Sequence, residues 1–331
     1  MTKTNKLDRM SPDFQHHSYM FNDQDKQFYF LRFAASVIIT FCILTFFTLL
    51  PADAEETMPD LHKLNQPEIL NVLFHPRRSS RNQPPAHAAD LNIQVDQDVT
   101  IGCRLFTADK NAPLIVFFHG NGETVQDYDD IGPLYGGQGL NFLVADYRGY
   151  GWSSGTPSAV SLIRDARTIF EKAAIWLKEN EYTGKIFVMG RSLGSACAID
   201  LALEFKDKVS GLIIESGFAE TIPLLRTLGI DLAAMDITED DCFNNLVKIS
   251  SITLPTYILH GQRDSLIPLW HAEHLHAAGG ARTKELQIVP GADHNSIITM
   301  TGILYFQAIK GFINKVTGSA GWRENRKRYQ R

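Results

Sequence analysis

The residues Gly190-Arg191-Ser192-Leu193-Gly194 constrain this chain more than any other feature of its sequence. They follow an apolar run at 185–189 that predicts a buried strand, and they precede a helical stretch at 195–204 whose first residues are small. A G-x-S-x-G sequence between a strand and a helix indicates a turn so tight that a side chain at either glycine would clash. Such a turn raises Ser192 above the sheet edge and points the backbone N–H of Leu193 toward the space beside it. We therefore interpret Ser192 as a candidate nucleophile.

A second copy of the pattern, Gly151-Trp152-Ser153-Ser154-Gly155, lacks this setting. The strand predicted at 140–145 ends several residues before it, and Thr156-Pro157 follows where a helix would have to begin. Proline so soon after the serine is typical of a loop. We therefore prefer Ser192 over Ser153, for which a loop position is expected. The structural alternative for Ser192 is a helix N-cap.

Two further residues have the positions that a nucleophilic serine requires of its partners. A serine hydroxyl attacks well when an imidazole accepts its proton and a carboxylate orients that imidazole, and after such a turn the acid and then the histidine follow in chain order. Asp264 comes just after the strand predicted at 254–260, and His294 just after the strand predicted at 285–289. Because catalytic groups gather at the carboxyl ends of parallel strands, we expect Ser192, Asp264 and His294 in one site.

Alternatives to Asp264 as the acid stay open. An aspartate after a strand is often only a turn residue. Asp293 is a rival acid because it adjoins His294, although neighbouring loop residues seldom face each other.

A loop that could supply a second oxyanion donor follows the strand predicted at 112–118. This loop reads His119-Gly120-Asn121-Gly122-Glu123. A glycine-rich turn directly after a strand leaves its backbone N–H groups free to point into a site. We expect Asn121 to complete an oxyanion hole with Leu193, and Gly122 is the alternative donor.

Four blocks, in chain order, resemble the α/β-hydrolase superfamily. They are Phe117–Gly122, Asp146–Ser153, Gly190–Gly194, and the pair His260–Asp264 with Gly291–His294. The similarity covers residues 91–316, and the chain is similar in particular to the Bem46-like, ABHD-type branch of small serine hydrolases with little lid. The resemblance implies that Ser192, Asp264 and His294 transfer an acyl group to water. It also implies that 151–155 is a loop after an early strand.

Strands that alternate with helical segments predict the α/β class. The longest segment, 161–180, places its apolar residues on one face, which favours a mostly parallel central sheet with helices on both faces. With 331 residues, 44% of them hydrophobic, the chain can form one large domain, which we place at 91–317. Only about 217–253 leaves room for a lid, which would be short.

Residues 33–52 contain no charged residue and are nearly all apolar, which is just long enough to cross a bilayer. Basic residues precede the segment and acidic residues follow it, so the positive-inside rule places residues 1–32 in the cytoplasm and the catalytic domain on the other side. A retained anchor and a cleaved signal peptide both fit, since Ala52-Asp53-Ala54 offers a cleavage site. Residues 53–90, with several prolines, are predicted to be a loosely structured tether.

The charge, the basic tail and the remaining histidines argue against several functions. A net charge of −5 gives no sign of nucleic-acid binding, and the basic tail at 318–331 is expected to be solvated, with binding to acidic partners as the alternative. The helical stretch at 269–278 carries His271, His274 and His276, which we expect to be solvated. His271 and His274 are three residues apart and could share a metal, but no cysteine or carboxylate at ligand spacing completes such a site. We expect neither a metal nor a cofactor.

The four cysteines do not suggest a disulfide framework. Cys42 and Cys197 lie in apolar surroundings and are expected to pack as small hydrophobes. Cys103 and Cys242 are the only candidates for pairing, and we expect them to be free thiols.

The sequence thus predicts a serine hydrolase, exported or anchored in a membrane, that acts on a small-molecule or lipid-like acyl substrate. An ester, a thioester or a related acyl bond is the expected target, and a peptide bond is open to the same residues. The alternatives are an acyltransferase with the same triad and a catalytically silent binding module. The last is disfavoured because nucleophile, acid, base and oxyanion loop are all present.

Overall fold

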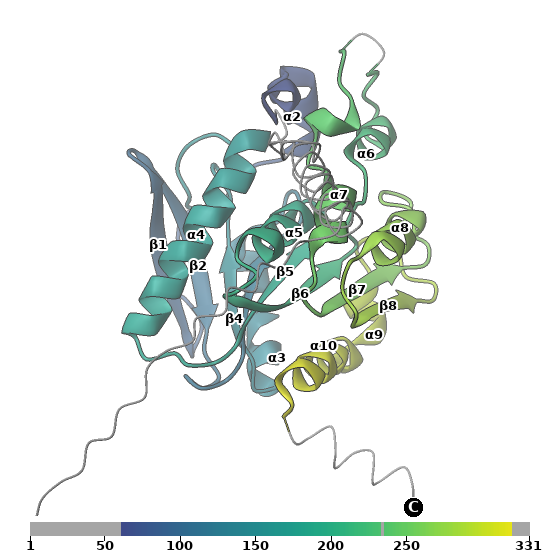
Figure 1. Cartoon of the computed structure of the whole chain (residues 1–331). Helices are drawn as coiled ribbons and strands as arrows, with labels where there is room; N and C mark the ends of the chain where they lie inside the picture. The colour runs from purple at the N-terminus through teal and green to yellow at the C-terminus, as the bar shows by residue number, and fades with distance from the viewer. Residues whose placement is uncertain (1–60, 233–234, 320–331) are drawn as a thin grey trace, which may run out of the picture. The chain divides into compact units, whose positions relative to one another are not determined.

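The computed structural model describes residues 61–232 and 235–319, and the described chain is built on one eight-stranded sheet (Figure 1). Its strands follow the order β1-β2-β4-β3-β5-β6-β7-β8 across the sheet. They are β1 (Ala88–Asp96), β2 (Val99–Phe106), β3 (Leu114–Phe118), β4 (Asn141–Ala145), β5 (Ile186–Arg191), β6 (Val209–Glu215), β7 (Thr256–Gly261) and β8 (Lys284–Val289). The β1–β2 and β2–β4 pairs are antiparallel and all others are parallel, as the alternation of strands and helices predicted.

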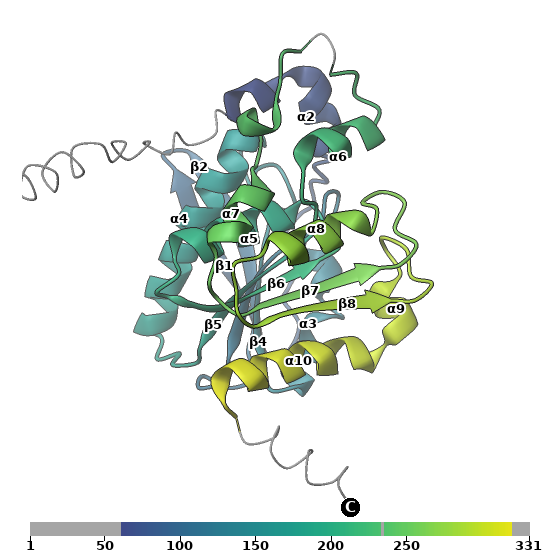
Figure 2. The ribbon, with the colours of Figure 1, turned by 45° about the vertical axis from the view of Figure 1, so that its right-hand side comes forward.

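Helices cover both faces of this sheet, which confirms the predicted fold class. Figure 2 shows α4, α5, α7 and α8 on one face and α3 and α10 on the other. The helices are η1 (Leu61–Asn65), α2 (Pro67–Leu73), η2 (Val125–Tyr128), α3 (Gly132–Gly137), α4 (Ala159–Glu179), α5 (Gly194–Glu204), α6 (Thr221–Thr227), η3 (Glu239–Asp241), α7 (Asn245–Ser251), α8 (Trp270–Ala278), α9 (Ile297–Thr301) and α10 (Ile303–Thr317).

Strand β3 shows why the central strands are apolar along their whole length. Leu114, Val116 and Phe118 pack into the core beneath α4 and α5, whereas Ile115 and Phe117 pack into the core beneath α3 and α10. Successive side chains of a strand point to opposite faces, and both faces are covered here. A parallel strand in this position must therefore be apolar at every residue.

Helix α4 follows the predicted segment 161–180 closely. Ser158 caps it, because its hydroxyl accepts the backbone N–H of Ser161 at 3.0 Å while the Ser161 side chain reaches back to Ser158. All seven apolar residues predicted to share one face are buried: Leu162, Ile163, Ala166, Ile169, Phe170, Ala173 and Leu177.

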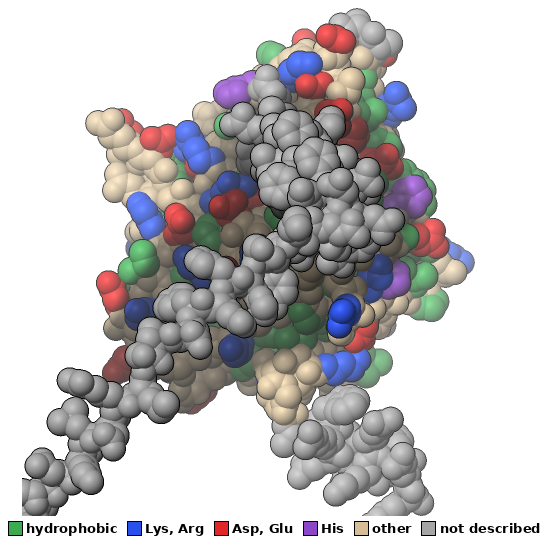
Figure 3. Space-filling view, in the orientation of Figure 1, with side chains coloured by type: hydrophobic (Ala, Val, Ile, Leu, Met, Phe, Trp, Pro, Cys, Tyr) green, Lys and Arg blue, Asp and Glu red, His purple; other side chains and the backbone are tan. Residues whose placement is uncertain are grey.

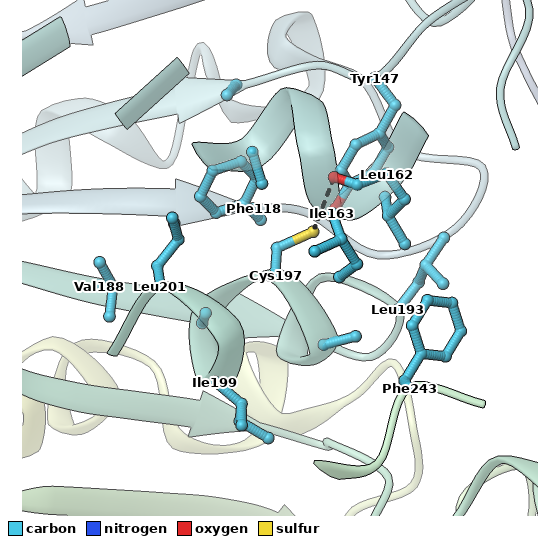
Figure 4. Packing of buried hydrophobic residues seen from close by; sticks show 14 of the residues in the cluster. Phe118, Tyr147, Leu162, Ile163, Val188, Leu193, Cys197, Ile199, Leu201 and Phe243 are labelled. Carbon is cyan, nitrogen blue, oxygen red and sulfur yellow. Dashed lines mark hydrogen bonds between the residues drawn. The ribbon is translucent and has the colours of Figure 1, made fainter. Parts of the chain in front are cut away.

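Helix α5, which follows the candidate nucleophile, is buried along nearly its whole length. Figure 4 shows Cys197 of this helix packed against α4, with its Sγ 3.8 Å from the carbonyl oxygen of Leu162. Cys103, Cys197 and Cys242 are buried free thiols, as predicted, and Cys42 lies outside the described residues.

The described part of the predicted tether is folded, so that prediction was wrong for 61–90. Leu64, Ile69 and Leu73 of η1 and α2 are almost completely buried against the domain, and β1 begins at Ala88. Within the described residues, the prolines that suggested a tether begin only at Pro76, after these apolar residues, apart from Pro67, which stands at the start of α2 where a helix tolerates proline.

The region expected to form a short lid, about 217–253, is only partly separate from the helical layer. Helix α6 and the short η3 lie between β6 and α7, but α7 packs against α5 and α8. It therefore belongs to the helical layer that covers the sheet. Residues 233–234 of this region lie outside the described chain.

The expected membrane segment 33–52 lies outside the described residues. Among the helices within 61–232 and 235–319, none has both the length and the apolar character needed to cross a bilayer. On the face seen in Figure 3, basic and acidic side chains are interspersed wherever the grey atoms leave the surface visible.

Candidate active site

The turn between β5 and α5 holds Ser192 in an unusual backbone conformation. Its φ of +52° lies in the left-handed region, which costs a non-glycine residue about 1 kcal/mol or more. A Cβ at Gly190 would lie 2.1 Å from the carbonyl oxygen of Gly194, and a Cβ at Gly194 would lie 2.0 Å from that of Phe118. Both glycines are therefore required by close backbone packing, as the sequence predicted.

The structure brings the three predicted residues together. The Nε2 of His294 lies 3.0 Å from the Oγ of Ser192, and its Nδ1 lies 2.7 Å from the Oδ2 of Asp264. Ser192, Asp264 and His294 are each less than a tenth exposed. They follow the carboxyl ends of β5, β7 and β8, which are parallel strands of one sheet with β6 between β5 and β7.

Asp264 is held by the backbone as well as by the histidine. Its Oδ1 accepts the N–H groups of Leu266 and Ile267 at 3.0 and 2.8 Å. The rival Asp293 is exposed, and its Oδ1 accepts the N–H of Asn295 at 3.0 Å. The geometry favours Asp264 as the partner of His294.

The second serine motif has a structural role. The Oγ of Ser153 accepts the backbone N–H of Gly102 at 2.9 Å, which fastens its loop to β2. Ser153 is 3% exposed, and its own N–H donates to Tyr150. It therefore stabilises the loop that the sequence predicted there.

Two backbone N–H groups are candidates for an oxyanion hole. Leu193 directly precedes α5, and Asn121 lies in the loop after β3. Neither N–H donates a hydrogen bond to another of the described residues. The loop around Asn121 is closed by Glu123, whose carboxylate accepts the N–H of Gly120 at 2.8 Å.

His119 fixes the start of this loop from within the core. The ring is fully buried, with Nδ1 at 2.8 Å from the carbonyl oxygen of Gly120 and Nε2 at 3.1 Å from the Oδ1 of Asp146. The hydroxyl of Tyr147 donates to the His119 carbonyl at 2.6 Å. The loop conformation is thus set by buried polar contacts.

Arg191 connects the parts of the site, a role that no motif in the sequence predicted. Its guanidinium pairs with Glu123 of the loop after β3 and, at 3.4 Å, with Glu215 of β6. It also donates to the carbonyl oxygen of His294 at 2.9 Å and to the Oδ1 of Asn295 at 2.8 Å. One side chain therefore links β5, the loop after β3 and the loop after β8.

This buried network shifts the pKa values of its carboxyl groups in opposite directions. Burial raises the pKa of Glu215, and the charge of Arg191 and the hydrogen bond from Tyr305 offset only part of that rise. Burial also pushes the pKa of Glu123 upward, but the charge of Arg191 outweighs it with help from His119 and Tyr128, so the pKa lies below its usual value. No pattern in the sequence signals these long-range partners.

A cavity of about 380 Å³ lies near these residues, but Ser192, Asp264 and His294 are not among the residues that line it. Gly122, Arg191 and Asn295 line it, and each is the chain neighbour of Asn121, Ser192 or His294. Aromatic side chains, among them Phe117, Tyr128 and Tyr305, form much of its remaining wall. A volume of this size suits a small organic group.

The histidines of α8 differ from the prediction that all are solvated. His271 is 1% exposed, and its Nδ1 accepts the N–H of Ala219 at 3.1 Å. Burial is the main reason why its pKa falls to about 4. The side chain of His274 is 54% exposed, as predicted. Across the described ranges, no group of three His, Cys, Asp or Glu side chains is arranged to hold a metal.

Comparison with known proteins places the chain among α/β hydrolases. A family model described as "Serine aminopeptidase, S33" matches residues 109–235. The chain is 30% identical over 211 residues to protein bem46 of Schizosaccharomyces pombe, covering 62% of this chain and 68% of that protein. It is also 30% identical over 227 residues to the human alpha/beta hydrolase domain-containing protein 17B, covering 65% of this chain and 71% of that protein.

Solved structures share the fold. An esterase from Pyrococcus furiosus aligns with a TM-score of 0.61 at 19% identity, covering 73% of this chain and 98% of the esterase. A soluble variant of the monoglyceride lipase from Saccharomyces cerevisiae, bound to a substrate analogue, aligns with a TM-score of 0.56 at 17% identity, covering 71% and 96%. At these identities the likeness concerns the fold.

Proposed function

This chain belongs to the Bem46-like branch of the α/β-hydrolase superfamily, and on that premise we propose that it is a serine hydrolase whose triad is Ser192, His294 and Asp264. The observation that carries the proposal is the continuous line of hydrogen bonds from Ser192 Oγ through the imidazole to Asp264 Oδ2, with lengths of 3.0 and 2.7 Å. Three residues that are far apart in the chain meet in the geometry that general-base activation of a hydroxyl requires.

In the proposed reaction, His294 Nε2 accepts the hydroxyl proton as Ser192 Oγ attacks the carbonyl carbon of the substrate. Asp264 keeps the imidazole oriented and faces the positive charge that it gains. The N–H groups of Leu193 and Asn121 stabilise the negative charge that develops on the carbonyl oxygen. The imidazolium then returns its proton to the leaving group, which departs and leaves an acyl-serine.

Water completes the cycle by the same route. His294 accepts a proton from the water, whose oxygen attacks the acyl carbon, and then returns the proton to Ser192 as the carboxylic acid leaves. Attack by an alcohol in place of water would produce a new ester, so the acyltransferase alternative uses the same residues. A silent binding module is the less favoured alternative, because it would not need the buried triad.

We propose an ester or thioester of a small-molecule or lipid-like acyl group as the substrate. The fold neighbours include an esterase and a monoglyceride lipase, and the cavity of about 380 Å³, which is lined by the chain neighbours of Ser192 and His294, combines aromatic walls with charged groups. A peptide bond is the second candidate, since the matching family model is described as a serine aminopeptidase.

A fluorophosphonate probe tests the proposal directly. Labelling of the wild-type protein that is lost in Ser192→Ala, with the circular dichroism spectrum unchanged, is the expected result. A series of p-nitrophenyl esters of increasing acyl length then defines the substrate class, with an aminoacyl anilide as the peptidase comparison. Labelling that persists in Ser192→Ala would assign the nucleophile elsewhere, and an unlabelled wild-type protein would favour the binding module.

A further inference from the structure

Residues 61–79 form a strap that precedes the sheet and runs beside the oxyanion loop. Here the oxyanion loop means residues 119–123. The strap is anchored in the domain by Leu64, Ile69, Leu73 and Phe74, each 5% exposed or less. The strap is therefore fixed to the core up to Phe74, directly before it reaches the oxyanion loop.

The side chain of Asn121 is the point where strap and loop meet. Its Oδ1 accepts the backbone N–H of His75 at 2.7 Å and the hydroxyl of Tyr150 at 2.7 Å. Its Nδ2 lies 2.7 Å from the Nδ1 of His75 and donates to the carbonyl oxygen of Val72 at 3.3 Å. The Tyr150 hydroxyl in turn accepts the His75 N–H at 2.9 Å. Both ends of the amide are thus engaged, three times by the strap.

After His75 the strap forms hydrogen bonds with two neighbouring segments, the one that follows the oxyanion loop and the loop at Gly151. The guanidinium of Arg77 donates to the hydroxyl of Thr124 at 3.2 Å and pairs with Asp127. The backbone of Gly151 donates to the carbonyl of Arg77 at 3.0 Å and accepts the N–H of Ser79 at 2.9 Å. These contacts hold the strap after His75, as its buried apolar residues hold it before His75.

We propose that residues 72–75 of the strap act in the active site: they hold the side chain of Asn121 and thereby position the backbone N–H of the same residue for the oxyanion. The inference rests on the proposed function, in which that N–H is one of two oxyanion donors. His75 and Tyr150 are then positioning residues. An oxyanion donor is effective because it is held in place before the charge develops, and a displacement of about 1 Å can cost about a hundredfold in rate.

Asn121→Ala is the central test, because it removes the amide while keeping the backbone N–H. We expect kcat/KM for the best p-nitrophenyl ester to fall about 10- to 100-fold with KM little changed. A trifluoromethyl ketone with the same acyl chain mimics the tetrahedral intermediate, and its inhibition constant should rise by the same factor. Hydrogen–deuterium exchange of peptides covering 119–123 should become faster.

Two graded variants and one control separate positioning from general destabilisation. Asn121→Asp keeps the oxygen that accepts from His75 and Tyr150, so it should retain more activity than Asn121→Ala. Tyr150→Phe removes one hydroxyl from the cluster and should give an intermediate loss. Ser79→Ala removes a strap hydrogen bond of 2.6 Å to Gln126, outside the oxyanion loop, and should leave kinetics and loop exchange unchanged.

The exchange measurement keeps this inference separate from the proposed function. If Ser192→Ala were as active as the wild type, the proposed chemistry would fail, yet faster exchange of 119–123 in Asn121→Ala would still show that the strap holds the loop. Unchanged exchange together with an unchanged ketone inhibition constant in Asn121→Ala would overturn the strap's role. Equal effects of Ser79→Ala and Asn121→Ala would overturn it as well.

Discussion

The Oδ2 of Asp264 lies 2.7 Å from the Nδ1 of His294, while the Oδ1 of the same carboxylate accepts two backbone N–H groups from its own loop. The carboxylate is therefore fixed by its turn, and the ring is fixed by the carboxylate. A turn aspartate and an acid that orients a histidine were alternative interpretations of the sequence. In the structure, Asp264 is both a turn residue and the carboxylate that contacts the histidine.

Replacing Asp264 with Asn should impair catalysis far more than binding. An amide in this position favours the wrong tautomer of His294, so kcat should fall by up to about four orders of magnitude with KM little changed. Steady-state kinetics on a p-nitrophenyl ester measures both constants. Asp293→Asn is the matched control and should stay within a few-fold of the wild type, since Asp293 is exposed. A crippled Asp293→Asn with a mild Asp264→Asn would exchange the two assignments.

The two serine motifs should respond differently to alanine. Ser192→Ala should abolish hydrolysis, whereas Ser153→Ala should keep at least about a tenth of it, because the loss of a triad member costs several orders of magnitude. Ser153→Ala should instead lower the free energy of unfolding by about 1 kcal/mol or more, since the N–H of Gly102 loses its buried acceptor. Comparable losses of activity in two well-folded variants would contradict the assignment. Adding Asp264→Asn to Ser192→Ala should cause no further loss.

His271 should make stability depend on pH in mildly acidic solution. Burial, with smaller effects of nearby His260 and His274, lowers its pKa from about 6.5 to about 4 in the folded chain. The unfolded chain then binds the proton first, so this contribution is fully present above about pH 6.5 and is lost as the pH falls toward 4. Urea denaturation at pH 7 and pH 4.5 should show a loss of the order of 2 kcal/mol from this residue, at about 1.4 kcal/mol per unit.

His271→Asn supplies the comparison for that experiment. Its amide oxygen can accept the N–H of Ala219 that the ring nitrogen accepts, but it does not titrate. The variant should therefore lose less stability between the two pH values than the wild type. Equal losses in both proteins would contradict the prediction and assign the acid sensitivity to other groups.

We propose that the catalytic domain lies on the non-cytoplasmic side of a membrane, through the apolar segment 33–52. A reporter that is active only in the periplasm or lumen, fused after Val316, should be active in cells. A reporter that requires the cytoplasm should be inactive at the same position. The reverse pair of results would place the domain in the cytoplasm, whatever its chemistry.

Two truncations should separate the segment that precedes the domain from the strap that belongs to it. Removing residues 1–58 should leave a folded and active enzyme. Removing residues 1–79 should destabilise the domain by several kcal/mol, because Leu64, Ile69 and Leu73 each bury a side chain worth about 2 kcal/mol. Thermal denaturation compares the two proteins. Equal melting temperatures would contradict the integration of the strap.

Much of the fold could be predicted because its signals are local. The helix at 161–180 and the strands at 112–118, 140–145, 185–189, 254–260 and 285–289 all correspond to observed elements. Apolar periodicity and turn residues suffice for such elements. The antiparallel β1–β2 hairpin and β6 were not predicted as strands with residue ranges. The strap was predicted to be a tether because its prolines are typical of loose segments, although apolar residues that form helices precede them.

The sequence by itself determined the candidate nucleophile, because a turn in which backbone segments come within contact distance requires glycines such as Gly190 and Gly194 around Ser192. It also supplied Asp264 and His294, because both follow strand ends in the required order. Only the tertiary structure decided between Asp264 and Asp293 as the partner of His294. It also placed His271 in the core. The contacts of Arg191 with Glu123, and of Asn121 with His75, were likewise decided by the tertiary structure. These contacts join residues from different elements, and their partners are fixed by the packing of the whole sheet and its helices, for which no local pattern exists.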